Sequence, residues 1–291
     1  MSALRVGAKL PSSGMAPDGR QIGELAAVAE AAGFDGVWVS DHVVMPRQVS
    51  SRYPFSADGT MSWQPEAPWV DALIAMAAAA EATETVDVGV GVLIIPLRNP
   101  LVLAKQLASI DVFSGGRTVI GVGAGWLREE FEALRADFDN RGAILDEWME
   151  ILRAVWTGVP PAKASGHYPM PDGLLAYPTP NRPPPLLVGG MSTAALRRVG
   201  AAGDGWFALQ HAHEIDPRKL EEGLAVIEAE AAKVGRGAPR RVAMRVPGAT
   251  PKVAASLAAL DDAGLTDIVV DVDWEGDGPA RVVEELHAAL A

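Results

Sequence analysis

An Asp-His dipeptide follows one of the strand-like segments of the sequence. Residues 36–40, GVWVS, are typical of a short buried strand, and Asp41 and His42 come directly after them. Because an imidazole exchanges its proton near neutral pH, His42 is a candidate general acid or base. Adjacent residues of an extended chain point to opposite sides, so one of the two can face a ligand while the other holds the structure. The alternative is that Asp41 caps the following turn and His42 only packs beneath the next loop.

Two glycine-rich segments also end strand-like runs. The first is GVGAGW, residues 121–126, whose glycines are spaced by two and do not match the dinucleotide fingerprint. Glycine there permits close approach of a ligand to the backbone, and a turn without a ligand is the alternative. The second is GGMS, residues 189–192, which enters a helix-like segment with Ser192 or Thr193 as its N-cap. Exposed amides at such a helix start bind phosphate, and the alternative is a junction that needs glycine only for its turn.

His211 and His213 form an H-x-H pattern after a later strand-like run. On an extended segment both imidazoles lie on one side, and that spacing can ligate a metal. A metal site needs further ligands from neighbouring strand ends, and Asp41 with His42 is the only obvious complement. We therefore expect these histidines to line a pocket, and we expect no metal site.

The segments around these residues alternate between short β-branched runs and Ala/Leu/Glu-rich runs of helical period, as in repeated βα units. Eight strands favour an α/β fold closed into a (β/α)8 TIM barrel, in which chemistry takes place where the strands end. A doubly wound open sheet is the alternative, because it shares the βα repeat. The expected strands are residues 5–10, 36–40, 86–95, 118–123, 186–189, 205–210, 241–246 and 267–272.

Nine helices are expected, which is one more than a barrel requires. Two connections are long, residues 43–68 after the second strand and residues 158–185 after the fourth. Loops of this length in a compact barrel are usually lids or binding loops. The expected helices are residues 22–32, 69–82, 100–113, 126–136, 140–156, 193–202, 217–234, 252–263 and 280–290.

The composition limits the partners of the protein. With 291 residues, of which 49% are hydrophobic, the chain suits one domain spanning residues 1–291. A net charge of -12 argues against nucleic acids and anionic membranes, which leaves a small-molecule substrate. The absence of cysteine excludes disulfides, thiolate metal sites and a cysteine nucleophile. Neither a signal segment nor a membrane-spanning run is visible, so a cytoplasmic location is expected.

Several longer motifs follow one another over nearly the whole chain. They are SDHVVMP from Ser40, the segment VGVGVLIIPLRNPLVLAKQLASIDVFSGGRTVIGVGAGW at residues 88–126, EEF at Glu129, LDEWMEILRAVWTG from Leu145, and PPLLVGGMSTAALRRVGAAGDGWF at residues 184–207. Taken together, they resemble the luciferase-like monooxygenase superfamily, and in particular its oxidoreductases that depend on the deazaflavin coenzyme F420. None of the motifs is specific by itself.

The resemblance implies a cofactor that lies across the mouth of the barrel, with its phosphate at the helix start after the fifth strand. It also implies a bulge in the third strand, with a non-prolyl cis peptide bond that supports the deazaflavin ring, and a homodimeric assembly. His42 is then the catalytic residue near the reactive ring carbon. The cofactor-binding residues that it implies are Asp41, Gly91, Val92, Ala124, Gly125, Gly189, Gly190, Met191 and Ser192.

The chain departs from the best-known branch of that group, the F420-dependent glucose-6-phosphate dehydrogenases. That branch has a catalytic carboxylate where this chain has Trp126 and a tryptophan where it has Pro46. Its acidic residue after the first strand falls near Ser13. Glucose 6-phosphate is therefore not the expected substrate.

We expect an F420-dependent oxidoreductase that transfers a hydride between the cofactor and a small organic substrate, with residues 43–68 as the cover of the site. An FMN-dependent luciferase-like monooxygenase is the alternative enzyme, because both cofactors carry a phosphate. The short chain and the plain GVGAGW loop favour F420. A barrel that binds a flavin without turnover is an alternative of another class, and a metal-dependent hydrolase is a more distant one.

Overall fold

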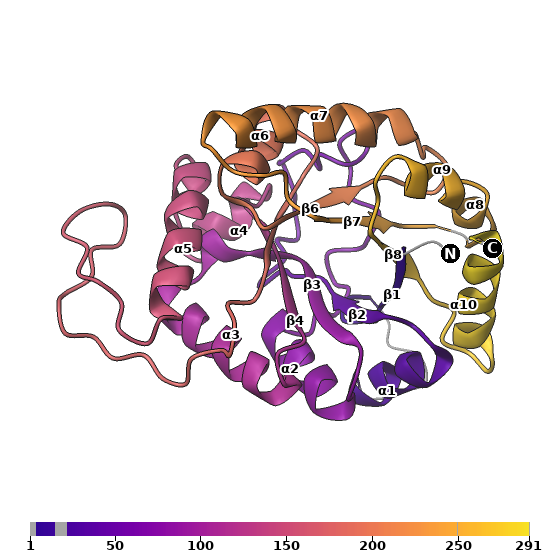
Figure 1. Ribbon diagram of the computed structural model, residues 1–291, viewed down its shortest axis with the longest axis horizontal. Helices are drawn as coiled ribbons and strands as arrows, with labels where there is room; N and C mark the ends of the chain where they lie inside the picture. The colour runs from indigo at the N-terminus through magenta and orange to yellow at the C-terminus, as the bar shows by residue number, and fades with distance from the viewer. Residues whose placement is uncertain (1–3, 15–21, 249, 291) are drawn as a thin grey trace.

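Eight parallel strands close into a barrel at the centre of the protein (Figure 1). The computed structural model describes residues 4–14, 22–248 and 250–290. Each strand pairs with the next along the chain and β1 pairs with β8, so the expected TIM barrel is confirmed and the open doubly wound sheet is wrong. The strands are β1 (Arg5–Lys9), β2 (Gly36–Val39), β3 (Asp87–Ile94), β4 (Thr118–Gly123), β5 (Leu186–Gly189), β6 (Gly205–Leu209), β7 (Arg241–Val246) and β8 (Asp267–Asp271).

Helices surround the barrel (Figure 1), and two of them, α4 and α5, lie between β4 and β5, which accounts for the expected extra helix. The helix expected at residues 252–263 is divided into α8 and α9. No helix within the described ranges is both long and apolar enough to traverse a lipid bilayer. The helices are α1 (Ile22–Ala32), α2 (Ala72–Ala82), the 3-10 helix η2 (Ile95–Leu97), α3 (Pro100–Ser114), α4 (Arg128–Ala133), α5 (Arg141–Val155), α6 (Thr193–Ala202), α7 (Pro217–Lys233), α8 (Thr250–Ala254), α9 (Leu257–Asp262) and α10 (Gly278–Ala289).

Two helices begin later than the sequence pattern predicts. α2 begins after Asp71 rather than at Trp69, because the Asp71 carboxylate caps it and accepts hydrogen bonds from two amides of the first turn at 2.9 and 3.1 Å. α4 begins at Arg128 rather than at Trp126. Trp69 and Trp126 therefore lie in loops, at the end of the barrel where the strands terminate.

Large side chains fill the inside of the barrel, and glycines make room for them. The rings of Trp38 in β2 and Phe207 in β6 have centroids 5.3 Å apart. A side-chain carbon at Gly89 of β3 would lie 2.4 Å from the Trp38 ring, and one at Gly7 of β1 would lie 2.6 Å from it. Glycine at both positions is therefore a packing requirement of Trp38. The same buried cluster contains Val119, Leu187, Ala243 and Val269.

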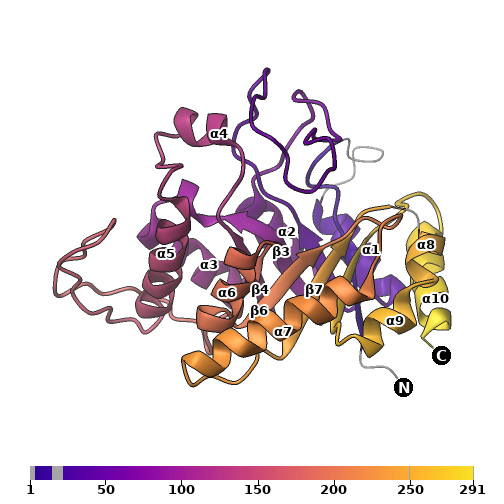
Figure 2. The same ribbon diagram turned by 90° about the horizontal axis from the view of Figure 1, so that it is seen from above.

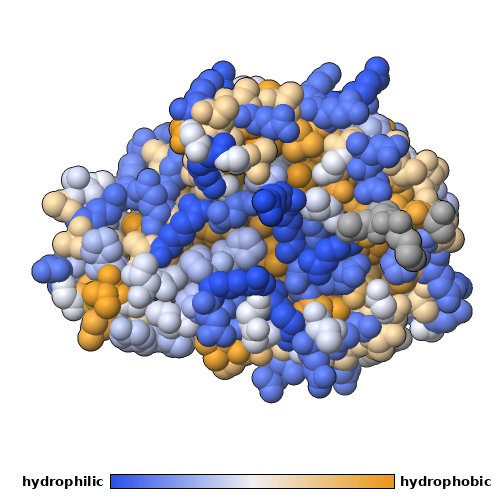
Figure 3. All heavy atoms as spheres, viewed as in Figure 1, coloured by the Kyte–Doolittle hydropathy of each residue, from blue (hydrophilic) through white to orange (hydrophobic). Residues whose placement is uncertain are grey.

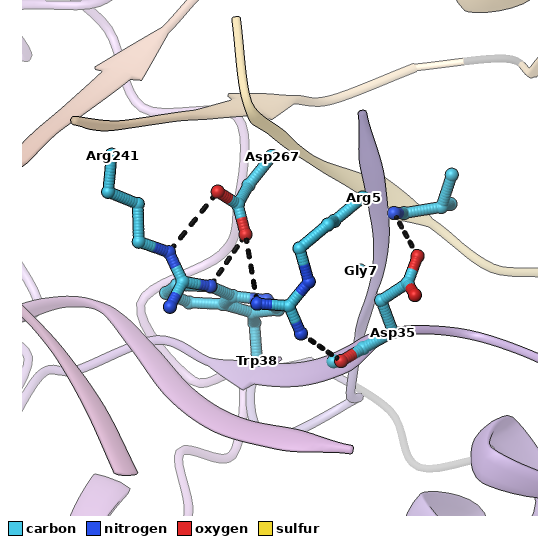
Figure 4. A pocket seen from close by; sticks show the side chains of 8 residues that line it. Arg5, Gly7, Asp35, Trp38, Arg241 and Asp267 are labelled. Atoms are coloured by element: carbon cyan, nitrogen blue, oxygen red, sulfur yellow. Dashed lines mark hydrogen bonds and ion pairs between the residues drawn. The ribbon is translucent and has the colours of Figure 1, made fainter. Parts of the chain in front are cut away.

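A network of ion pairs closes the N-terminal end of the barrel. The Asp87 carboxylate lies 2.6 Å from Arg5 and 2.7 Å from Arg241, and the Asp267 carboxylate lies 2.5 Å from Arg241. Figure 4 shows the guanidinium groups of Arg5 and Arg241 turned toward Asp267. Hydrophilic side chains gather over the middle of this face of the molecule (Figure 3). Because these charges satisfy one another, this end closes the barrel and the opposite end is the one available for chemistry.

Residues 43–68, which we call the cover loop, rise at the C-terminal end of the strands beside α4 (Figure 2). The second long connection, residues 158–185, extends outward beside α5 instead (Figure 1). Glu147 of α5 anchors it by accepting hydrogen bonds from the amides of His167 and Tyr168 at 2.8 and 3.1 Å. Of the two long loops, the cover loop is therefore the one that lies over the mouth of the barrel.

Packing around Trp38 gives a test of the barrel interior. We expect Gly89→Ala to lower the free energy of unfolding by about 1–3 kcal/mol, because the added methyl group overlaps the indole ring. Urea unfolding followed by circular dichroism measures this change. Gly237→Ala is the matched control, since an added methyl group there meets no described atom within 4 Å. Equal stability of the two variants would contradict the packing role of Gly89.

Candidate active site

His42 follows β2 at the mouth of the barrel and is held by a buried glutamate. Its Nδ1 atom lies 2.8 Å from Oε2 of Glu130, and both side chains are buried. Because a carboxylate only accepts hydrogen bonds, Nδ1 donates and Nε2 is left for a ligand. The pair therefore has the arrangement of an acid–base residue that a carboxylate orients.

α4 fastens the cover loop through two neighbouring glutamates. Oε1 of Glu130 accepts hydrogen bonds from the amides of Val43 and Val44 at 2.6 and 3.3 Å. Glu129 accepts hydrogen bonds from the amide and the hydroxyl of Ser51 at 3.0 and 2.7 Å. The EEF motif by itself predicts no role for Glu130, because this residue is 88 positions away from its histidine partner. Only the fold brings them together.

Aromatic side chains surround His42. The centroid of its ring lies 4.8 Å from that of Trp69, 6.0 Å from that of Trp63 and 6.1 Å from that of Trp126. The centroid of the Tyr53 ring lies 5.2 Å from that of Trp63 and 5.2 Å from that of Trp126. An enclosure of this kind excludes water from the imidazole and strengthens electrostatic interactions within it. The sequence does not reveal this enclosure, because aromatic residues in a loop carry no periodic signal.

The guanidinium of Arg98 donates hydrogen bonds to both oxygens of the Asp41 carboxylate. Its Nη1 and Nη2 atoms donate to Oδ2 and Oδ1 of Asp41 at 2.8 and 2.7 Å, and the amide of Ile94 donates to Oδ2 at 2.9 Å. Burial raises the pKa of Asp41, while the guanidinium and the amide oppose that shift. Asp41 therefore joins the end of β2 to the end of β3. Its contact with a cofactor stays a prediction.

The bulge expected in β3 is present. The peptide bond between Gly91 and Val92 is cis, and the pairing of β3 with β4 shifts register between Val90 and Leu93. Gly91 and Val92 are half-buried, whereas the residues on either side of them are buried. This part of the strand is therefore the part that a ligand at the mouth can reach. Support of a cofactor ring by the bulge stays a prediction.

Glycines of β4 and β5 make room for the Val92 side chain. A side-chain carbon at Gly123 would lie 2.7 Å from Cγ2 of Val92, and one at Gly189 would lie 2.6 Å from Cγ1. One at Gly121 would lie 2.5 Å from the carbonyl oxygen of Val90. The first two glycines of GVGAGW, Gly121 and Gly123, are therefore explained by packing against the bulge. Phosphate binding at Gly189 stays a prediction.

The loop after β4 turns tightly at Gly125. Its φ of +83° is left-handed, and a side-chain carbon there would lie 2.7 Å from the Phe131 ring and 2.8 Å from Ile94. The Gly125 carbonyl accepts a hydrogen bond from Nε of Arg141 at 3.2 Å. Ala124 is half-buried and packs against the core. These contacts hold the loop in place, and the cofactor contacts of Ala124 and Gly125 stay predictions.

The start of α6 is suited to bind an anion. Ser192 is its N-cap as expected, since Oγ accepts a hydrogen bond from an amide of the first turn at 3.2 Å. Gly190 has a φ of +119°, and its carbonyl accepts a hydrogen bond from Nε1 of Trp206 at 2.8 Å. Met191 between them is half-buried, and residues 192–194 are exposed. Amides at the start of this 10-residue helix carry partial positive charge, which favours a phosphate.

Charged side chains of β1, β7 and β8 occupy another part of the mouth. Nζ of Lys9 donates to a backbone carbonyl and to Oγ of Ser12, the latter at 3.3 Å. Arg245 pairs with Asp271. Burial, reinforced by nearby Arg245, lowers the pKa of Lys9 to about 7. Sequence analysis missed this group because single charged residues in strands carry no distinguishing pattern.

His211 and His213 have ring centroids 5.6 Å apart but different surroundings. Nε2 of His211 donates to the carbonyl oxygen of Phe55 at 3.0 Å, which attaches the cover loop to the end of β6. His213 is exposed and lies 3.4 Å from Glu214. Within the described part of the chain, no group of three or more His, Asp or Glu side chains is placed to hold a metal ion.

Comparisons with known sequences agree with this geometry. The family model described as luciferase-like monooxygenase matches residues 2–281. An uncharacterized protein of Mycobacterium tuberculosis is 32% identical over 247 residues, which cover 84% of this chain and 83% of that protein. An F420-dependent glucose-6-phosphate dehydrogenase of Amycolatopsis mediterranei is 32% identical over 207 residues, which cover 70% of this chain and 56% of that protein.

Solved structures share the fold. An F420-dependent secondary alcohol dehydrogenase in complex with an F420-acetone adduct has a TM-score of 0.78 at 18% identity and covers 100% of both chains. The oxygenating constituent of 3,6-diketocamphane monooxygenase of Pseudomonas putida, in complex with FMN, has a TM-score of 0.72 at 16% identity, covering 98% of this chain and 97% of that one. At such identities the likeness shows the fold alone. From the family model, which matches nearly the whole barrel, the chain belongs to the luciferase-like monooxygenase family and is an oxidoreductase of that family.

Proposed function

We propose that this protein binds coenzyme F420 across the mouth of the barrel and transfers a hydride between F420 and a small organic substrate. The observation that carries the proposal is the His42–Glu130 pair, enclosed by aromatic rings at the same end of the barrel as the bulge and the start of α6. A relative that is named an F420-dependent dehydrogenase supports the choice of cofactor.

The residues at the mouth fit such a cofactor. The Val92 side chain of the bulge adjoins Gly123 and Gly189, so the bulge lies next to both the loop after β4 and the turn that enters α6. The half-buried backbone of the bulge would lie against the ring, with residues 124–125 beside it. The exposed amides at the start of α6 would hold the phosphate.

When bound, F420 supplies a ring carbon that donates or accepts a hydride. The protein has to position the substrate, move a proton and exclude water. His42 presents Nε2 for the proton, because Glu130 occupies Nδ1. The aromatic rings around His42 exclude water from its imidazole.

The structure gives no reason to extend the sugar-phosphate activity of the named relative to this chain. Trp126 stands where that branch has a catalytic carboxylate, and its ring packs 6.1 Å from His42. The buried carboxylate nearby, Glu130, is engaged with His42 and the cover loop. We propose a substrate with an apolar body instead, and we retain the homodimer and the cytoplasmic location as predictions.

Cofactor titration tests the proposal. We expect the purified protein to bind F420 in preference to FMN, as followed by the fluorescence of each cofactor. Thr193→Glu adds a carboxylate to the first turn of α6, which suits the helix but repels a phosphate, so the affinity for F420 should fall about tenfold or more. Thr193→Gln, of the same size without the charge, should retain most of the affinity. Tight binding of FMN without binding of F420 would overturn the proposed cofactor.

Turnover tests the roles of His42 and Glu130, with a substrate found by screening alcohols and carbonyl compounds for changes in F420 absorbance. His42→Ala should leave F420 binding largely intact and slow turnover by a factor of about 100 or more. Glu130→Gln should slow turnover by about tenfold or more and alter its pH profile, because the amide loses the charge that orients the imidazole. Glu132→Gln makes the same charge change on the exposed side of α4 and is the control. Full activity of His42→Ala would remove that histidine from the mechanism.

A further inference from the structure

Two tryptophans of the aromatic enclosure have buried indole nitrogens that lack an acceptor. The Nε1 atoms of Trp63 and Trp69 are shielded from solvent, and neither has a hydrogen-bond partner among the residues that the structure describes. A buried donor without an acceptor is costly, and native proteins have few of them. Two such donors side by side therefore require an explanation.

Three other tryptophans of this protein have indole groups with acceptors. Nε1 of Trp148 donates to the Arg98 carbonyl at 2.8 Å, and Nε1 of Trp156 donates to the Ala104 carbonyl at 3.1 Å. Trp206 donates to a carbonyl of the turn before α6. These three indole donors are satisfied, whereas the two beside the candidate acid–base residue have no acceptor in the described part of the chain. The unsatisfied pair belongs to the functional end of the barrel.

The rings of the two tryptophans and of His42 lie close together. The ring centroids of Trp63 and Trp69 are 5.8 Å apart, and those of the two indoles lie 6.0 and 4.8 Å from that of His42. An indole N–H can donate but cannot accept, so the group it prefers is an oxygen with free lone pairs. The neighbouring side chains of the enclosure are also aromatic, which suits an apolar molecule with one such oxygen.

We propose that the N–H groups of Trp63 and Trp69 bind the reacting oxygen of the substrate, and that the substrate is a carbonyl compound or its alcohol with an apolar body. This inference rests on the proposed function. Reduction of a carbonyl adds a hydride to its carbon and a proton to its oxygen, while the cofactor is oxidised by two electrons; oxidation of the alcohol is the reverse. Negative charge develops on the oxygen, where two fixed donors stabilise it and His42 exchanges the proton.

A pair of matched probes tests this assignment. Cyclohexanone and methylenecyclohexane have nearly the same shape, but only the ketone offers an acceptor oxygen. We expect the protein, titrated with and without F420, to bind the ketone more tightly. Of the signals from its eight tryptophans in an indole ¹H–¹⁵N spectrum, we expect the two that Trp63→Phe and Trp69→Phe remove to shift with the ketone and not with the hydrocarbon.

The variants separate hydrogen bonding from ring packing. Each of Trp63→Phe and Trp69→Phe should lower the affinity for the ketone, relative to that for the hydrocarbon, about three- to tenfold. Trp126→Phe, which alters the same enclosure without removing either unsatisfied donor, should leave that ratio unchanged. If a variant does not fold, the wild-type protein still decides the matter through its preference between the probes.

Equal affinity of the wild-type protein for the two probes would overturn the assignment. So would indole signals of Trp63 and Trp69 whose chemical shifts do not change when the ketone is added. The cofactor proposal is judged separately, by the F420 titration. Binding of F420 without any preference for the ketone removes the oxygen site alone. Selective binding of the ketone without binding of F420 removes the cofactor proposal and leaves the oxygen site standing.

Discussion

The hydrogen bonds of one buried carboxylate organise the mouth of this barrel. Glu130 accepts from Nδ1 of His42 through one oxygen and from the amides of Val43 and Val44 through the other. A buried carboxylate is costly unless hydrogen bonds occupy its oxygens, so the glutamate, the histidine and the start of the cover loop are stable only together. The orientation of the imidazole and the position of the cover loop are therefore coupled.

Several glycines of this barrel are required by the packing of neighbouring side chains, whether or not a ligand is bound. The absence of side chains at Gly7 and Gly89 makes room for the Trp38 ring inside the barrel. The absence of side chains at Gly123 and Gly189 makes room for Val92. A side-chain carbon at Gly91 would lie 2.1 Å from the ring of Phe207, so the bulge rests directly on the aromatic filling of the barrel. A ligand at the mouth would then lie on backbone that close packing already holds in place, which reduces the cost of ordering the site on binding.

The two ends of the barrel differ in how their polar groups are satisfied. At the N-terminal end, arginines and aspartates pair with one another and leave the barrel closed. At the C-terminal end, Lys9 has a lowered pKa, and two buried indole donors find no acceptor among the described residues. Polar groups with shifted pKa values or without hydrogen-bond partners are expected at functional sites, because a ligand can bind to them.

Sequence pattern was sufficient for the eight strands, for Ser192 as the N-cap of α6 and for His42 at a strand end, because each depends on local periodicity or capping chemistry. The resemblance to a family predicted the cis peptide bond between Gly91 and Val92, which the structure contains. The starts of α2 and α4 were predicted too early, because the helix-like pattern of the sequence extends back beyond the residue at which each helix begins.

The sequence by itself therefore determined the barrel and the position of His42 at the end of a strand. Only the tertiary structure decided that Glu130 orients His42, that Arg98 rather than a turn engages Asp41, and which aromatic rings enclose the site. The physical reason is that these contacts join segments far apart in the chain. Their formation depends on how the barrel brings its strand ends, α4 and the cover loop together, and no local pattern encodes that arrangement.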